Sequence, residues 1–364
     1  MTSASELQQK IVKPTVRVSE VDWLSFSVCR KELLNLEKCN DRKTGMNLFP
    51  TKGLPVLPKK RDPMFDDETP VYVDRAKILC ERFFGLTVVG GFGKMGYTDG
   101  FKLFTPDRVF AGSVFWGGNG NNNTFHFQIT GQGCCYLFDV IRRTRAGQRE
   151  LTPYSLLLLF QILGVEYLSR CDLKIDIRDK SLTFRKVKNA YNRREFSRGR
   201  GAYPVATHYH KFAIDGETKG ETFMIGQRGN NVFWRIYDKA KQLNLDTDWL
   251  RVEVELKNCE VSVLENTTVS FASLCPFSEK LTQSPFKKKF CFNRVVRTAA
   301  ENLIRSTEWL RRQCSKTLLE VINDCGSIEI ALGVILAGKE EHPFHSKYDV
   351  PRGMYDEMYN VINA

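Results

Sequence analysis

The chain has 364 residues, 42% hydrophobic and 26% charged, as expected of a globular protein that can bury a sizeable core and hold two domains. Its 54 Lys and Arg exceed its 42 Asp and Glu, and the net charge of +12 favours a polyanionic partner, nucleic acid before membrane. The eleven cysteines lack the regular spacing of a disulfide framework, which argues against a disulfide-stabilised protein. The sequence has no signal-peptide pattern, and its longest apolar run, 156–163, is too short to span a membrane. We expect a soluble, intracellular protein.

The first segments in chain order are predicted to be a mobile N-terminal segment, a strand, a loop and a helix. Residues 1–20 are predicted to be a mobile lead, and residues 21–28, VDWLSFSV, a strand. Residues 40–70 hold five of the 13 prolines, which predicts a long loop or insertion. Residues 74–84 have apolar side chains at helical spacing.

A glycine-rich segment follows at residues 91–96, where GFGKMG fits the pattern GxGxxG. In a dinucleotide-binding fold this loop opens a helix, and an acidic residue follows about twenty residues later at a strand end. Here TDGFKLF follows, with another glycine and strand-forming residues. We predict a hairpin, and a nucleotide-dependent oxidoreductase is the disfavoured alternative.

The middle of the chain predicts two more strands and a helix. Residues 125–129 alternate apolar and polar side chains, as do residues 172–177. Between them, Thr152 and Pro153 are the N-cap and first residue of a predicted helix that runs to Leu163.

Two segments are strongly basic. Residues 185–200 hold seven Lys and Arg against one acid, which suits either a DNA path or a solvated helix face. Residues 287–316 hold nine against two, and amphipathic helices are predicted to run to about Leu336. We therefore predict a core at 21–277 and a basic, helical, DNA-binding module at 278–364, with the boundary at 278–285.

The most informative stretch is 222–257, where two strand patterns each have one apolar and one polar face. Val232, Trp234 and Ile236 alternate with Phe233, Arg235 and Tyr237. Residues 251–257 alternate in the same way and bring Arg251, Glu253, Glu255 and Lys257 to one face. An antiparallel sheet with one face in water would give the same alternation.

Taken together, the polar faces concentrate Asp172, Asp176, Glu253 and Glu255 beside Tyr237. Crowded carboxylates require a cation, and oxygen ligands suit Mg²⁺ or Mn²⁺. The Tyr237 hydroxyl could then attack a DNA phosphate, with Arg235 neutralising the developing charge. The alternative for Tyr237 is a structural tyrosine at a strand end.

His208 and His210 flank one residue of a predicted strand, the arrangement that HUH-class nickases use to bind metal. A chance HxH is common, and His126 with Gln128 resembles this arrangement more weakly. A metal site and a chance occurrence both stay open at this point.

Six short motifs together resemble the replication initiation factors of the rolling-circle type, the Rep_trans family of filamentous phages and Gram-positive plasmids. They occur in the expected order over residues 21–257: VDWLSFS (21–27), KMGY (94–97), ITGQGC (129–134), RCDLKID (170–176), RIYDK (235–239) and RVE (251–253). The length and helical tail look most like the replication proteins of filamentous vibriophages.

The resemblance implies an α+β core around an antiparallel sheet, distantly like the HUH nickases. It also implies origin-specific nicking and rejoining through a covalent 5′-phosphotyrosine. Tyr237 would be the nucleophile, with Mg²⁺ or Mn²⁺ held by Asp172, Asp176 and Glu253 and with Asp22 as a further candidate ligand. The family works without an HUH pair. Lys174 departs from its pattern, because a small residue usually lies between the two aspartates.

The implied partners are double-stranded origin DNA, the nicked single strand, and the host helicase and polymerase in a bacterial cytoplasm. A homodimer is left open, and no membrane partner is expected. A non-catalytic DNA-binding regulator on the same fold is the alternative function. The predicted DNA contacts are Lys239, Arg251, Lys287, Lys288 and Lys289.

Overall fold

The computed structural model describes residues 16–41, 46–57, 69–118, 123–199, 202–214, 218–292, 307, 310–311 and 313–336. The chain divides into two compact units, Met1–Asn293 and Arg294–Ala364. In the described part of the second unit, α10 (Ser315–Cys325) is followed by α11 (Ile328–Leu336), and Gly326 with φ +71° ends α10. No helix of the described residues is long and apolar enough to cross a membrane.

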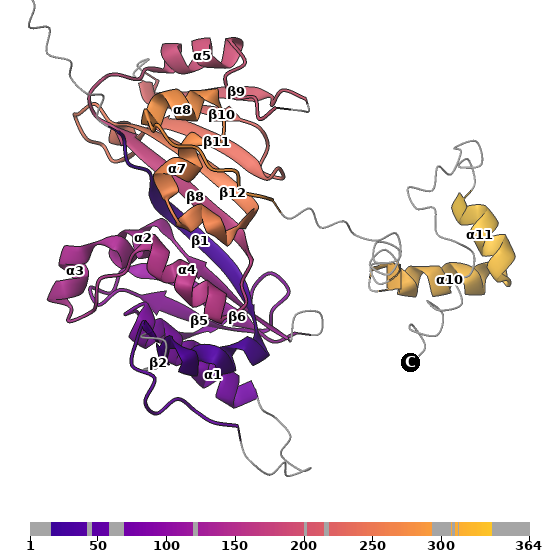
Figure 1. The fold of residues 1–364 in the computed structure, drawn as a ribbon. Helices are drawn as coiled ribbons and strands as arrows, with labels where there is room; N and C mark the ends of the chain where they lie inside the picture. The colour runs from indigo at the N-terminus through magenta and orange to yellow at the C-terminus, as the bar shows by residue number, and fades with distance from the viewer. Residues whose placement is uncertain are drawn as a thin grey trace, which may run out of the picture. The chain divides into compact units, whose positions relative to one another are not determined.

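The first unit is built on a ten-stranded antiparallel sheet flanked by helices, so the predicted α+β class is confirmed (Figure 1). The strands lie in the order β4 (Thr87–Phe92), β5 (Asp99–Phe104), β6 (Phe110–Trp116), β7 (Thr124–Ile129), β1 (Glu20–Cys29), β8 (Tyr167–Ile177), β12 (Leu250–Glu260), β11 (Val232–Asp238), β10 (Thr218–Ile225) and β9 (Ala206–Phe212). Within the predicted 40–70 loop, β2 (Asn40–Asp41) pairs with β3 (Met46–Asn47), and residues 42–45 and 58–68 lie outside the described residues.

The sheet consists of two halves with the same topology. In the first half β1 is followed by helices and then by the meander β4–β5–β6–β7, whose last strand returns to pair with β1. In the second half β8 is followed by a helix and by the meander β9–β10–β11–β12, whose last strand returns to pair with β8. The antiparallel β1–β8 pair is the seam that joins the halves.

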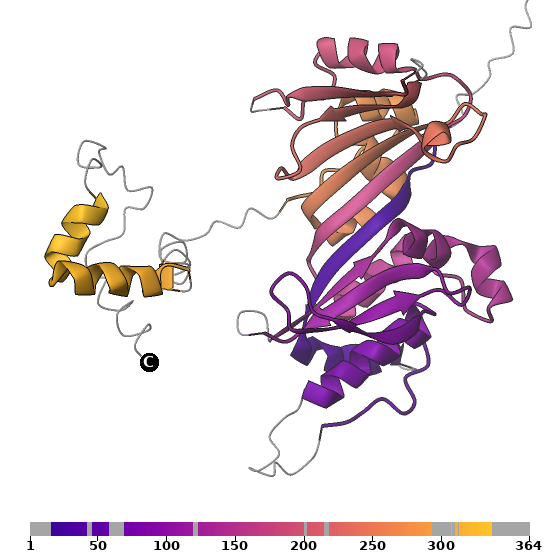
Figure 2. The ribbon, with the colours of Figure 1, turned by 180° about the vertical axis from the view of Figure 1, so that it is seen from behind.

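Helices cover one face of the sheet. Those of the first half are η1 (Arg30–Cys39), α1 (Thr69–Ile78), η2 (Leu79–Phe83), α2 (Gly131–Phe138), α3 (Val140–Arg145) and α4 (Pro153–Ile162). Those of the second half are α5 (Phe184–Asn192), η3 (Val261–Leu264), α7 (Thr267–Ala272) and α8 (Pro276–Thr282), while the short α6 (Lys239–Gln242) follows the end of β11. In Figure 1, α4, α7 and α8 lie in front of the central strands, whereas the reverse view in Figure 2 shows β8, β11 and β12 without them. We call these two sides of the second half the helix face and the open face.

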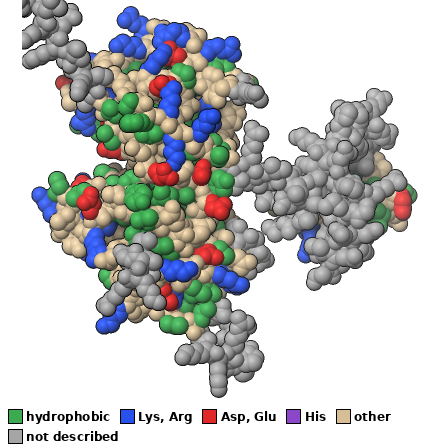
Figure 3. All heavy atoms as spheres, in the orientation of Figure 1, with side chains coloured by type: hydrophobic (Ala, Val, Ile, Leu, Met, Phe, Trp, Pro, Cys, Tyr) green, Lys and Arg blue, Asp and Glu red, His purple; other side chains and the backbone are tan. Residues whose placement is uncertain are grey.

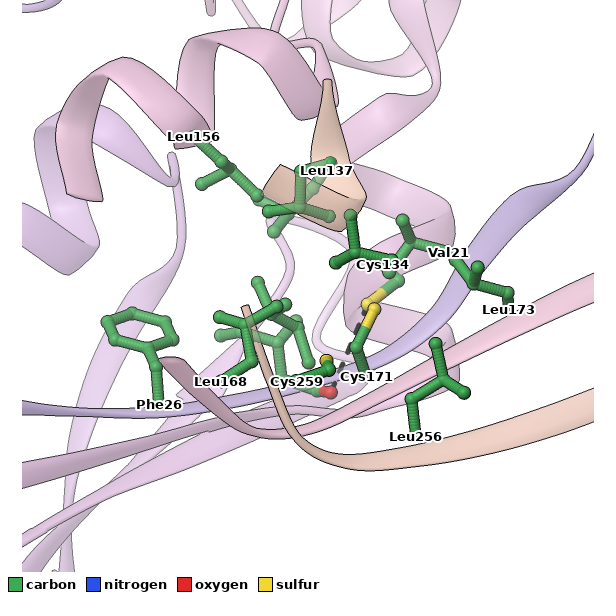
Figure 4. Close-up of a cluster of buried hydrophobic side chains, with 14 of the residues drawn as sticks. Val21, Phe26, Cys134, Leu137, Leu156, Leu168, Cys171, Leu173, Leu256 and Cys259 are labelled. Carbon is green, nitrogen blue, oxygen red and sulfur yellow. Dashed lines mark hydrogen bonds between the residues drawn. The ribbon is translucent and has the colours of Figure 1, made fainter. Parts of the chain in front are cut away.

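The apolar side chains of the central strands point to the helix face and form the core. Leu173, Val254 and Trp234 are buried there. Near the seam, Val21, Cys134, Cys171 and Cys259 pack with leucines of α2, α4, β8 and β12 (Figure 4). The other side chains of the same strands must therefore face the opposite side of the sheet.

Local sequence features place these elements as predicted. The Thr152 hydroxyl accepts a hydrogen bond from the Ser155 N–H at 3.1 Å and begins α4. The GFGKMG segment forms the turn of the β4–β5 hairpin, which confirms the predicted hairpin and excludes the helix that a nucleotide site needs. A side chain at Gly93 would meet the carbonyl oxygen of Tyr97 at 2.1 Å, so the turn requires glycine there.

Two expected boundaries differ from the structure. Residues 1–15 of the predicted mobile lead lie outside the described residues, but Arg17 is anchored by its N–H to the Thr282 carbonyl at 3.0 Å. The expected module boundary at 278–285 also falls inside the first unit, which continues to Asn293. The reason is that α8 buries Phe277 and Leu281 in the core of that unit.

Candidate active site

The strand register lines up the polar side chains of the open face in rows. Asp176 lies opposite Arg251, which lies opposite Tyr237. In the next row Lys174 lies opposite Glu253, which lies opposite Arg235, and beyond it Asp172 lies opposite Glu255. The structure therefore brings the predicted tyrosine, arginine and carboxylates to one face of three adjacent strands.

Tyr237 is hydrogen-bonded to a carboxylate of the neighbouring strand. Its hydroxyl donates to Glu253 Oε2 at 3.1 Å, and the side chain is partly buried near the end of β11. Burial, followed by the negative charge of Glu253, raises the pKa of Tyr237 well above its usual value. The phenol is therefore neutral at pH 7 and can act as a nucleophile only if a base takes its proton.

Glu253 is placed to be that base. The side chain is buried, with 4% of its surface exposed, and burial raises its pKa to about 7 although Arg235 opposes the shift. The Arg235 guanidinium contacts Glu253 Oε1 and also Asp172 Oδ2 at 3.2 Å. Arg235 therefore holds two buried carboxylates in place, one of which accepts the tyrosine proton in the hydrogen bond.

Arg170 supports this group from β8. It binds both oxygens of Asp172, at 2.8 and 2.5 Å, and Glu255 at 3.1 Å, while its guanidinium lies 4.7 Å from the centre of the Trp23 ring. Sequence reasoning placed Glu255 on the carboxylate face but did not assign Arg170 to the site. The sequence could have indicated Arg170 only by its position, because Arg170 and Asp172 are two residues apart on one strand and share a face.

A second ionic cluster lies beside the first and is centred on Arg251. This buried arginine donates to both oxygens of Asp176, at 2.7 and 2.9 Å, and to Asp22 at 3.3 Å. Lys174 binds Asp22 at 2.9 Å. A register shift in β1 between Val21 and Trp23 accompanies the turn of Asp22 toward these cations.

The three predicted metal ligands do not gather at one point. Asp172 and Asp176 are four residues apart on β8, about 13 Å along a strand, and Lys174 lies between them. Asp176 is bound by Arg251 and by the Trp249 indole at 2.8 Å, whereas Asp172 and Glu253 share Arg235. The set therefore splits into the pair Asp172 and Glu253, which lie together, and Asp176, which belongs to the other cluster.

The histidines occupy other places. His126 is buried on β7, where Ser27 Oγ lies 2.9 Å from its Nδ1, and burial lowers its pKa to about 4. Among the described residues, the one group of three side chains with metal-ligand geometry is His208, His210 and Glu221. It includes none of the predicted carboxylate ligands.

The predicted DNA contacts are scattered. Lys239 follows Tyr237 closely at the start of α6, and its Nζ lies 5.8 Å from the centre of the tyrosine ring. Arg251 is buried and already bound by two aspartates. Lys287 binds Glu279 at 2.9 Å and Lys288 binds Glu265, so this lysine run lies among the helices of the helix face.

The described residues 185–199 of the basic segment also belong to the helix side. Arg185, Lys186 and Lys188 are exposed on α5, while Val187 and Ala190 face the core. Figure 3 views this side and shows Lys and Arg side chains gathered over the part of the molecule that contains α5. The segment therefore does not line the surface around Tyr237.

Comparison with known proteins connects the second half of the sheet to a family. No curated protein matches the chain significantly. A solved structure, the rolling circle replication initiator protein from Geobacillus stearothermophilus, aligns over 68% of this chain and 77% of its own, with 18% identity and a TM-score of 0.42. The family model described as replication initiation factor matches residues 167–327. The resemblance found in the sequence is thus confirmed for the segment that holds β8 to β12: residues 167–327 carry the pattern of a Rep_trans replication initiation factor.

Proposed function

We propose that the chain is a rolling-circle replication initiator that nicks and rejoins one strand of its origin DNA through Tyr237. The match of residues 167–327 to replication initiation factors supports the initiator role. The observation that carries the chemistry is the hydrogen bond from the Tyr237 hydroxyl to the buried carboxylate of Glu253. It pairs a nucleophile with a base whose pKa lies close to neutral pH.

The proposed nicking step is a phosphoryl transfer in line with the leaving group. The Tyr237 oxygen attacks the phosphorus, its proton passes to Glu253, and the bond from phosphorus to the 3′ oxygen breaks. The 3′ oxygen takes a proton from solvent, and the 5′ phosphate stays on Tyr237 as an ester. In rejoining, the 3′ hydroxyl attacks that ester and gives its proton to solvent. The bond from phosphorus to the Tyr237 oxygen breaks, and Glu253 returns its proton to the tyrosine.

Arg235 has two roles in this proposal. Its terminal nitrogen holds Glu253 and Asp172, while its buried Nε has no partner among the described residues. Its positive charge therefore lies beside the place where the attacked phosphate gains negative charge. Lys239, next to the tyrosine ring, is the nearest of the predicted DNA contacts.

The predicted three-carboxylate site for Mg²⁺ or Mn²⁺ does not fit this arrangement. Asp176 is held apart from the other two, and Arg235 already compensates the charge that Asp172 and Glu253 share. In the proposed reaction no step passes through a metal. Asp172 and Glu253 stay the two predicted ligands that lie together.

DNA is proposed to approach the open face, since helices cover the other side of the sheet (Figure 2). An exposed Arg178 lies 3.9 Å above the centre of the Trp249 ring beside the Arg251 cluster, and stacked cations of this kind suit an unpaired strand. Lys287, Lys288 and Lys289 would then contact flanking duplex from the helix side. Host helicase and polymerase would extend from the free 3′ end in the bacterial cytoplasm.

The test uses supercoiled origin plasmid and a matched pair of tyrosine variants. Tyr209 lies on the same face in the same cross-strand row, separated from Tyr237 by Thr222, and it is 53% exposed. Tyr237→Phe should lose both nicking and the covalent protein–DNA adduct, whereas Tyr209→Phe should keep both. An adduct that persists in Tyr237→Phe would refute the assignment. DNA binding without nicking by the wild type would favour the non-catalytic regulator instead.

A further inference from the structure

A group of metal-ligand side chains lies on the outermost strands of the second half, away from Tyr237. His208 and His210 are on the edge strand β9, and Glu221 is on β10 directly opposite His210. His208 Nε2 lies 2.8 Å from Glu221 Oε1, and His208 Nδ1 lies 3.2 Å from His210 Nε2. One ligand atom from each side chain can be chosen so that all three lie within 4.8 Å of one another.

Aromatic rings hold the two imidazoles in position. The His208 ring lies 5.1 Å from Phe223 and 5.9 Å from Phe184 of α5, and the His210 ring stacks on Phe212 at 5.8 Å. His208 is only partly exposed, whereas His210 is open to solvent. The site is therefore backed by an apolar wall and accessible from outside, as a metal site with an entry path requires.

The strand register places this group on the opposite side of the sheet from the tyrosine. Thr222 lies between Tyr209 and Tyr237 in one row, and Phe223 lies between His208 and Ile236 in the next. Side chains in adjacent rows point to opposite faces. The histidines therefore share the helix face with Ile236, and the sheet separates them from the Tyr237 hydroxyl.

We propose that His208, His210 and Glu221 form a binding site for a divalent transition metal ion of the Zn²⁺ class. Two imidazoles and one carboxylate are a common protein ligand set for such ions, with a further position open to water. Mg²⁺ prefers oxygen ligands and is a poor match for this set. Bonds of about 2.0–2.1 Å place ligand atoms around a tetrahedral Zn²⁺ roughly 3.4 Å apart, a contraction that side-chain rotations can supply.

The bound ion would clamp the edge of the sheet. β9 has one neighbouring strand, β10, and the metal would join these two strands through their side chains. Because β10 in turn pairs with β11, the ion would stabilise the strand next to the one that carries Tyr237. The ion therefore acts on stability and does not take part in the chemistry at the tyrosine.

The experiment titrates the metal-free full-length protein with ZnCl₂ and follows binding by calorimetry and by thermal unfolding. The wild type should bind with a rise in unfolding temperature, and MgCl₂ should not compete. His208→Gln/His210→Gln should bind Zn²⁺ at least about 100-fold more weakly, because changes outside the ligand set alone cost 10–100-fold. His126→Gln is the matched control, since that histidine lies in the other half of the sheet.

Cobalt spectroscopy separates this site from the eleven cysteines. Co²⁺ at the proposed site should give ligand-field bands without a thiolate charge-transfer band, and the double histidine variant should lose them. Equal Zn²⁺ affinity in wild type and double variant, or a thiolate band that accounts for all binding, would overturn the proposal. Zn²⁺ binding should persist in Tyr237→Phe, so failure of the proposed function would not change this result.

Discussion

The two halves of the sheet share one topology but differ in their side chains on the open face of the second half and on the same side of the first half, where Ser25 lies opposite Arg170. Two rows of the first half join Ser25, Gln128 and Ser113, and then Ser27, His126 and Phe115. Each row of the corresponding central strands of the second half contains at least two charged side chains, drawn from Arg, Lys, Asp and Glu. The same strand topology therefore occurs in both halves, but the candidate active-site residues lie in the second half.

The two halves also differ in the buried groups on this side of the sheet. In the first half burial lowers the pKa of His126 to about 4, so the group is neutral at pH 7 and needs no counter-ion. In the second half Asp172, Glu253 and Glu255 are buried beside Arg170 and Arg235. Buried charges of this kind are stable only as a network, which concentrates the consequences of substitution there.

The largest expected effect is on nicking. Glu253→Gln removes the proton acceptor of Tyr237 but keeps a similar shape, so the single-turnover nicking rate should fall by roughly 10²–10⁴. The wild-type rate should rise as pH increases through about 7, where Glu253 loses its proton, and the variant should lose that dependence.

The matched change in the first half is Ser27→Ala, which removes the hydroxyl beside His126. It should leave nicking close to wild type. An equal loss of rate in the two variants would mean that both halves take part in the reaction.

The next effect is on stability. Arg251→Gln leaves Asp176 and Asp22 without their shared guanidinium, and breaking a buried pair in this way should lower the free energy of unfolding by roughly 3–5 kcal/mol. Urea denaturation measures the change. Arg178→Gln removes an exposed arginine from the same neighbourhood, and it should have an effect of about 1 kcal/mol or less. Equal losses in the two variants would contradict the network.

The smallest effect is a pair of opposite pH dependences. Glu253 has a folded pKa raised from 4.5 to about 7, so its contribution to stability falls as pH rises through that window. His126 has a folded pKa lowered from 6.5 to about 4, so its contribution rises as pH increases between those values. Each amounts to roughly 3 kcal/mol at most.

Urea unfolding of the wild type, Glu253→Gln and His126→Gln across this pH range isolates the two contributions by difference. The differences between wild type and variant should have slopes of opposite sign. Slopes of the same sign would contradict the opposite pKa shifts of Glu253 and His126.

Much of the fold followed from alternation along single strands. The predicted segments at 21–28, 125–129, 172–177 and 232–237 are strands, and the grouping of Asp172, Glu253 and Glu255 on one face with Tyr237 is confirmed. Each of these statements depends on side chains within one strand, where a period of two decides the face.

What the sequence could not supply was the register between strands. Register decides that Glu253 lies between Lys174 and Arg235, and that His208 shares a face with Ile236 and not with Tyr237. The separation of Asp172 from Asp176, in contrast, could have been calculated from the rise of a strand.

The pairing of β1 with β8 matters for any attempt to produce the second half of the sheet as a separate fragment. A fragment that starts at β8 would keep Tyr237, Arg235, Glu253 and Asp172 but would lose Asp22 and the strand that pairs along β8. The exposed edge of this eleven-residue strand would offer unpaired N–H and C=O groups to a second molecule. The first half, which carries little of the candidate chemistry, thus protects the second half from edge-to-edge aggregation.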